Sequence, residues 1–333
     1  MEPMRWKIKT DIIENVSLNI GEYSSIYDEY ATQEEDILEI INCYFQKRNS
    51  NKNEVTIYDE INQEDVSYSN YQSFIFSHEM IEKEHSLAAS TIMAKKLNRL
   101  MKDTVEIEGY FNSINVMLED MIDVLECELP IRPKHFDYKA FIKLLSFEYE
   151  LTQDYSRLIV RLEQMIPLLI EELNKQTNNQ TLLIYYYPEA NLSPKEQVRF
   201  ANLLKSLPAT VIVLTGSSQF LSENLSAMNY IRESAQMITD EFIDNLVWEA
   251  LLVYEREEVI SSLERFIKTY QSKFELNPTI SNYQLHEIML FEEIDLYVGV
   301  RFMAHIRQNF ELDIQYTQLS KPIQAYLKTY DTE

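Results

Sequence analysis

LLIYYYPEANLSPKEQVRFANLLKSLPATVIVLTGSSQFL, residues 182–221, is the stretch that decides the fold of this chain. Its two apolar runs, 182–187 and 211–214, are each followed by residues that turn the chain, and both have the length of a buried strand. Between them, Ser193 is placed to cap a helix whose first position is Pro194. A strand, a helix and a second strand in this order predict a parallel strand pair joined by a right-handed crossover.

This unit is typical of the back half of a nucleotide-binding sheet, where ligands lie beyond the strand ends. A phosphate loop in the front half needs closely spaced glycines, because only glycine lets the backbone amides close around phosphates. The four glycines of the chain lie far apart, and the expected first strand end, 20–25, has one glycine and no lysine. The sequence therefore predicts a nucleotide-hydrolase-like sheet without its phosphate loop. An ordinary α/β sheet that never had such a loop is the alternative.

Composition indicates a folded, largely helical protein of two domains. The chain has 333 residues, of which 45% are hydrophobic and four are glycine. It has no apolar run long enough to cross a membrane and no signal-peptide pattern, so we expect a cytoplasmic protein. Its two cysteines, Cys43 and Cys127, form no spaced motif, and we expect both to be structural thiols.

The order of the expected elements divides the chain into three parts. Strand patterns occur at 6–10, 16–20, 23–27, 55–58 and 73–77, and helical patterns occur at 32–47 and throughout 81–175, with a break near Gly109 and a stiff connector at 129–133. We predict the α/β class, with a head sheet at 1–80 and 176–224, a long helical leg at 81–175 and a mostly helical C-terminal extension at 225–333.

The net charge of −24 argues against nucleic acid as a partner unless the basic residues are gathered in one place. Two segments of the expected leg are such places. The first, 86–102, has no acidic residue, and in the second, 132–143, only Asp137 opposes the basic residues. Their candidate binding residues are Lys95, Lys96, Arg99, Lys102, Lys134, Lys139 and Lys143. A solvated helix face is the alternative for both segments.

An acidic cluster lies between these two basic segments. Glu119, Asp123 and Glu126 fall on one side of a helix, and Glu128 follows them. Carboxylates that converge without counter-ions repel one another unless a cation joins them. Calcium is the natural candidate, because it accepts about six to eight oxygens in loose geometry. The spacing is not that of an EF-hand, so a solvated acidic face is the alternative.

No pattern in the chain indicates a catalytic centre. None of the five histidines belongs to an HxH or HExxH motif, and Ser217–Ser218 lacks the GxSxG context of a nucleophile. We therefore expect a protein that is not an enzyme, and we name no catalytic residue.

The order of the motifs resembles a known family. WKIKT and VSLNI come first, then VTIYDEI, then helical arms with DMIDVLECEL and FDYKAFIKLLSFEYE, and finally LLIYYYPEANLSPKEQ and TVIVLTGSSQF. This order resembles the long form of the CRISPR-associated accessory protein of type II-A systems, which takes part in spacer acquisition and forms a DNA-binding ring. The resemblance covers residues 4–222, and the helices after them resemble the extension of the long form.

The resemblance implies a function in antiviral defence. It implies a cytoplasmic homotetrameric ring that holds the end of double-stranded DNA in a lysine-lined hole, with the integrase proteins and the effector nuclease of the same system as partners. It also implies calcium, and by position Glu119, Asp123, Glu126 and Glu128 match the calcium region of the family. The acidic balance of this chain and its Pro130/Pro133 connector depart from the family pattern.

Two other functions stay open at the level of the sequence. The chain could be an acidic scaffold that holds the proteins of the adaptation complex together and binds DNA weakly or not at all. It could also be an unusual nucleotide hydrolase.

Overall fold

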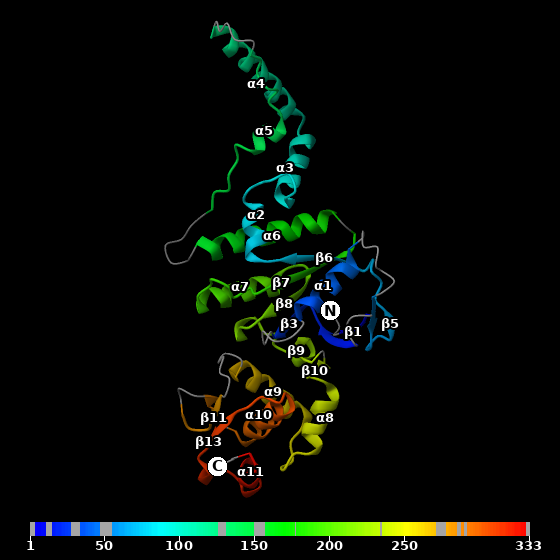
Figure 1. Ribbon diagram of the computed structural model, residues 1–333, viewed down its shortest axis with the longest axis vertical. Helices are drawn as coiled ribbons and strands as arrows, with labels where there is room; N and C mark the ends of the chain where they lie inside the picture. The colour runs from blue at the N-terminus through cyan, green and yellow to red at the C-terminus, as the bar shows by residue number, and fades with distance from the viewer. Residues whose placement is uncertain are drawn as a thin grey trace. The chain divides into compact units, whose positions relative to one another are not determined.

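The computed structural model describes residues 4–10, 15–27, 34–46, 55–125, 131–149, 157–176, 178–233, 235–270, 278–284, 288–289 and 292–330. The chain divides into two compact units (Figure 1). Unit 1 comprises Met1–Ile75 and Asn179–Glu333, and unit 2 comprises Phe76–Asn178. None of the described helices is both long enough and apolar enough to cross a membrane.

The central sheet of unit 1 confirms the predicted strand–helix–strand unit. Its strands lie in the order β10 (Ala235–Gln236), β9 (Met228–Arg232), β3 (Tyr23–Tyr27), β8 (Thr210–Thr215), β7 (Gln180–Tyr186) and β6 (Tyr71–Phe76). β7 and β8 are parallel, with Ile184 opposite Ile212, and α7 (Pro194–Ser206) connects them after the Ser193 cap. Every residue of β8 is buried, as expected for a parallel strand covered on both faces.

The sheet continues further along the chain than the sequence predicted. β9 lies parallel to β3 on the side opposite β8, with Asn229 beside Ile26. β10 then pairs with β9 in the antiparallel direction. Residues 225–236, which we assigned to the C-terminal extension, therefore contribute two strands and the short 3-10 helix η2 (Leu225–Ala227) to the head sheet region.

The N-terminal strands form a second sheet, which confirms the predicted strand pair. The order is β2 (Val16–Ile20), β1 (Met4–Lys9), β4 (Thr56–Asp59) and β5 (Glu64–Asp65), and all neighbours are antiparallel. Trp6 lies opposite Leu18, and both are fully buried. The Trp6 ring packs against the rings of Phe45, at the end of α1 (Glu34–Phe45), and Tyr71, with centroids 5.5 Å away in each case.

The C-terminal region has its own apolar core, built mainly from helices. The helices are α8 (Asp240–Trp248), α9 (Arg256–Tyr270), α10 (Glu293–His305) and α11 (Lys321–Leu327), with the 3-10 helices η1 (Ser218–Phe220) before them and η3 (Tyr316–Gln318) between α10 and α11. A small parallel sheet, absent from the prediction, accompanies them and consists of β12 (Ile288–Met289), β11 (Thr279–Ser281) and β13 (Glu311–Asp313).

Unit 2 is helical, as predicted for this part of the chain. Its helices are α2 (His78–Glu84), α3 (Ile92–Asp103), α4 (Val105–Val124), α5 (Tyr138–Ile142) and α6 (Arg157–Gln176). The predicted break near Gly109 is wrong, because α4 runs through Gly109 without interruption. The chain breaks instead at Thr104, which is extended and donates its hydroxyl hydrogen to Leu100 O at 2.9 Å. An exposed glycine lowers helix stability but does not end a helix by itself.

A buried amide network joins the two sheets of unit 1. The Asn19 amide nitrogen on β2 donates to Asn229 Oδ1 on β9 at 2.7 Å, and Asn229 Nδ2 donates to Asn19 O at 2.9 Å and Ser25 O at 3.1 Å. Gln236 Nε2 donates to the same Asn229 Oδ1 at 2.6 Å. Asn19 Nδ2 lies within 3.4 Å of the carbonyl oxygens of Leu225, Met228 and Ile238.

We predict that Asn229→Ala destabilises unit 1 by about 3 kcal/mol, because it leaves buried donors and acceptors on β2, β3 and β10 without partners. Urea unfolding followed by circular dichroism measures the change. Asn202→Ala, at an exposed position of α7, is the matched control and should change stability by less than about 0.5 kcal/mol. Equal stability of the two variants would contradict the importance of the network.

Candidate nucleic-acid interface

Unit 2 brings the two predicted basic segments together. Lys102, in the last turn of α3, lies over the ring of Tyr138 on α5, with Nζ 5.4 Å from the ring centroid. Asn115 of α4 fixes the chain just before α5, since it accepts from Phe136 N at 2.7 Å and donates to Phe136 O at 3.0 Å. Phe111 of α4 packs against the rings of Phe136 and Phe141. The second basic segment is therefore held beside α3 and α4.

Most of the predicted lysines are available to a ligand. Four of them are exposed and make no ion pair with any other residue that the structure describes: Lys95, Lys134, Lys139 and Lys143. Lys102 is also exposed, and its ring contact leaves its charge uncompensated. Asp137, the acidic residue of the second segment, accepts a hydrogen bond from Ala140 N at 2.9 Å as the N-cap of α5. Its charge is thus directed toward the helix start.

Arg99 and Lys96 behave differently from these lysines. Arg99 Nη2 lies 2.7 Å from Glu172 Oε2 on α6, and the Glu172 side chain is only 1% exposed. Burial alone raises the pKa of Glu172, but hydrogen bonds from Gln176 and Arg99 and the charges of Arg99 and Lys96 outweigh it and lower the pKa below its ordinary value. Arg99 therefore compensates a buried carboxylate, which separates it from the exposed lysines.

We predict that Arg99→Ala destabilises unit 2 by about 2 kcal/mol at neutral pH, because it leaves the buried Glu172 carboxylate without its cation. The pair stabilises the fold above the carboxyl range and loses its effect as the pH falls through the lowered pKa of Glu172. The difference between parent and variant should therefore shrink in acid. Chemical unfolding at several pH values measures it.

Lys95→Ala is the matched control for Arg99→Ala, since Lys95 is exposed on the same helix and has no ion pair with a described residue. Its removal should leave stability nearly unchanged at every pH. A destabilisation by Arg99→Ala that persists undiminished in acid would show that the guanidinium acts through packing rather than through charge.

The predicted calcium ligands are only partly described. Glu119 and Asp123 are exposed and lie one turn apart on α4, whereas Glu126 and Glu128 lie outside the described residues. Two carboxylates supply at most four oxygens, which is fewer than calcium ordinarily takes. Within the described part of the chain, no three or more side chains of the metal-binding types converge. The described residues alone therefore do not form a calcium site.

The strand ends of the central sheet carry internal hydrogen bonds. Glu189, after β7, accepts from Thr215 Oγ1 at 2.8 Å and from Gly216 N at 2.7 Å, both at the end of β8. The first strand of the parallel sheet is β3, so the segment in the phosphate-loop position is 28–33 and not 20–25, as we predicted. Its sequence, DEYATQ, has two acidic residues and neither glycine nor lysine.

The sequence analysis missed two residues that build this interface, Asn115 and Tyr138. Asn115 hydrogen-bonds across a separation of 21 residues, and no local pattern marks such a contact. Tyr138 stands between basic residues in the sequence, which is the only signal that could have indicated its contact with Lys102.

No protein-family model and no curated protein matches the chain. Among solved structures, the chain is similar to Stu0660 of Streptococcus thermophilus, with a TM-score of 0.55, 16% identity and coverage of 98% of this chain and 99% of that chain. A nucleotide-free ATP-binding cassette from an ABC transporter gives a TM-score of 0.30 at 14% identity, over 71% of this chain and 90% of that chain, which is too distant to carry an argument. The similarity to Stu0660 extends over the whole chain and concerns the fold alone.

Proposed function

We propose that this protein binds the ends of double-stranded DNA without sequence preference and is not an enzyme. The observation that carries the proposal is the gathering of exposed lysines without carboxylate partners in unit 2 of a chain whose net charge is −24. An acidic protein repels DNA at long range, so contact has to occur where carboxylates are sparse. Contacts of lysine with phosphates position DNA but carry no sequence information.

The setting of this function follows from the resemblance to the type II-A accessory protein. We propose a cytoplasmic homotetrameric ring that acts in CRISPR spacer acquisition, with the integrase proteins and the effector nuclease as partners. In a closed ring each lysine occurs once per subunit, so a few lysines per chain become a positive collar around a duplex. The similarity of the whole fold to Stu0660 is compatible with this proposal.

We predict that Lys95→Ala/Lys134→Ala/Lys139→Ala weakens binding of linear duplex DNA and makes it less salt-dependent. Each lost phosphate contact should lower the slope of log affinity against log salt by about one. Filter binding at several salt concentrations measures both effects. Linear fragments should also bind better than covalently closed circles of the same sequence, because a ring needs an end to enter.

The matched control is Lys9→Ala/Lys195→Ala/Lys321→Ala, which removes the same charge from exposed positions of unit 1. It should leave the salt slope unchanged. Equal loss of binding in both triple variants would show that net charge, and not the leg lysines, determines affinity. Equal affinity for closed circles and linear fragments would remove the argument for a ring.

We propose calcium as a ligand of Glu119 and Asp123 together with Glu126 and Glu128, or with carboxylates of a second copy. A ligand that binds only the folded state raises its stability by mass action. Calcium should therefore raise the Tm of the parent and leave that of Glu119→Gln/Asp123→Asn unchanged, as measured by scanning calorimetry. Magnesium is the control ion. A parent Tm that does not respond to calcium would contradict the proposal.

Two alternatives have separate tests. If the protein is an acidic scaffold, it should show no DNA binding even at low salt, while still binding the partner proteins. If it is an unusual nucleotide hydrolase, it should bind a nucleotide in the presence of magnesium. The second alternative is disfavoured by Glu189, whose carboxylate already accepts from the Gly216 amide at the strand ends.

A further inference from the structure

The connection between α8 and α9 is an exposed extended segment with an alternating pattern. Leu251, Val253 and Glu255 are exposed, whereas Leu252 and Tyr254 are half-buried against the C-terminal core. Val253 is 97% exposed, and Trp248, at the end of α8, is 88% exposed. Single exposed apolar residues are ordinary, but two large ones within six residues, both almost fully in water, are typical of a contact surface.

The backbone of this segment is also unpaired. From Leu251 to Tyr254, neither the amides nor the carbonyls make a hydrogen bond to another residue that the structure describes. The hydrogen bonds resume on either side, where Ala250 N donates to Val247 O and Glu258 N donates to Glu255 O. An extended stretch with free donors and acceptors and an alternating side-chain pattern can accept a strand from another chain.

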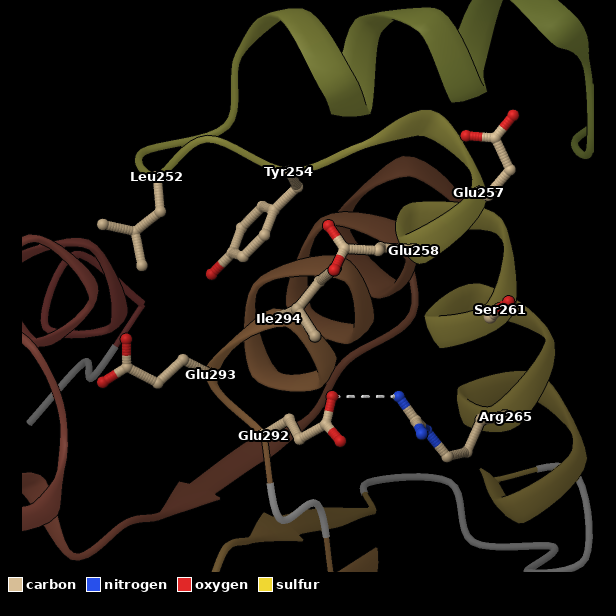
Figure 2. Close-up of a pocket in the computed structure, with 9 residues that line it drawn as sticks. All are labelled: Leu252, Tyr254, Glu257, Glu258, Ser261, Arg265, Glu292, Glu293 and Ile294. Carbon is tan, nitrogen blue, oxygen red and sulfur yellow. Dashed lines mark hydrogen bonds and ion pairs between the residues drawn. The ribbon is translucent and has the colours of Figure 1, made fainter.

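A pocket of about 540 Å³ lies beside this segment (Figure 2). Leu252 and Tyr254 line it from the segment, and its carboxylates come from the starts of α9 and α10: Glu257, Glu258, Glu292 and Glu293. Its cation, Arg265, is already held by Asp295 at 2.7 Å and lies 3.5 Å from Glu292.

The interior of the pocket favours a hydrogen-bonding cation. The hydroxyl oxygen of Tyr254 is buried and has no hydrogen-bond partner among the described residues. Burial, and then the charges of Glu293 and Glu258, raise the pKa of Tyr254, which keeps the hydroxyl protonated and leaves its oxygen as an acceptor. A lysine or arginine side chain supplies both a donor for this oxygen and charge for the carboxylates.

We propose that residues 251–254 dock an extended segment of another protein in which basic and apolar residues alternate. The backbones pair as neighbouring strands, apolar side chains of the partner cover Val253 and Trp248, and a basic side chain enters the pocket. A second copy of this chain is a poor occupant, because each copy carries 54 acidic and 30 basic residues and so repels the other. The proposal concerns unit 1 and does not depend on DNA binding.

The two tryptophans of the chain allow a direct test. Trp6 is fully buried and Trp248 is exposed, so a change in fluorescence on adding a peptide reports the surroundings of Trp248. The probe is a short, acetylated and amidated peptide of alternating lysine and valine. We expect a saturable blue shift of the emission. The same peptide with glutamate in place of lysine, and a version with N-methylated backbone amides along one edge, should each bind at least about tenfold more weakly.

Paired variants locate the binding. Glu257→Gln/Glu292→Gln should weaken binding about tenfold, while Glu106→Gln/Glu108→Gln, which removes the same charge from exposed positions of unit 2, should not. Calorimetry of Trp248→Phe confirms affinities without the fluorophore. No saturation by the lysine peptide up to about 1 mM overturns the proposal. It is equally overturned if the N-methylated or the glutamate peptide binds as well, or if the two double variants bind alike.

Discussion

The side-chain amides of Asn19 and Asn229 are buried where the two sheets of unit 1 meet, and an amide in that place has to satisfy both its donors and its acceptor. This requirement allows one register between β2 and β9, since a shift by one residue would put apolar side chains opposite the free polar groups. Gln236 and the Ile238 carbonyl belong to the same network and lead directly into α8. The position of the C-terminal helices relative to the sheets of unit 1 therefore depends on these two amides.

Charge organises unit 2 in a similar way, by separating two kinds of cation. The planar guanidinium of Arg99 suits the buried carboxylate of Glu172, whereas lysine is a strongly hydrated point charge that favours solvent. The arginine on α3 therefore supports the fold, and the exposed lysines keep their charge for a ligand. In a chain with this much negative charge, even a modest group of uncompensated lysines produces a local field of the opposite sign.

The sequence predicted the elements whose signals are local. β7, α7 and β8 followed from apolar runs and from the Ser193–Pro194 helix start, and the β1–β2 pair followed from alternation. β9 escaped because MNYIR is short and its asparagine serves a distant partner. The basic residues could be named from composition, but the contact of Lys102 with Tyr138 depends on the link from Asn115 to Phe136, which no spacing rule contains. The phosphate-loop position was misplaced because β2 was taken for the first strand of the parallel sheet.

α4 spans 20 residues, all described by the structure, and none of them is buried, although Val116, Met117 and Met121 are apolar. In Figure 1 it extends away from α2 and α6. A helix of this length without tertiary support is only marginally stable in water. Its amide hydrogens should therefore exchange with solvent through local opening long before those of β8, which open only with the whole unit. The exchange rate along α4 is thus a direct reporter of assembly, because any surface that covers its apolar side chains slows that exchange without changing the fold.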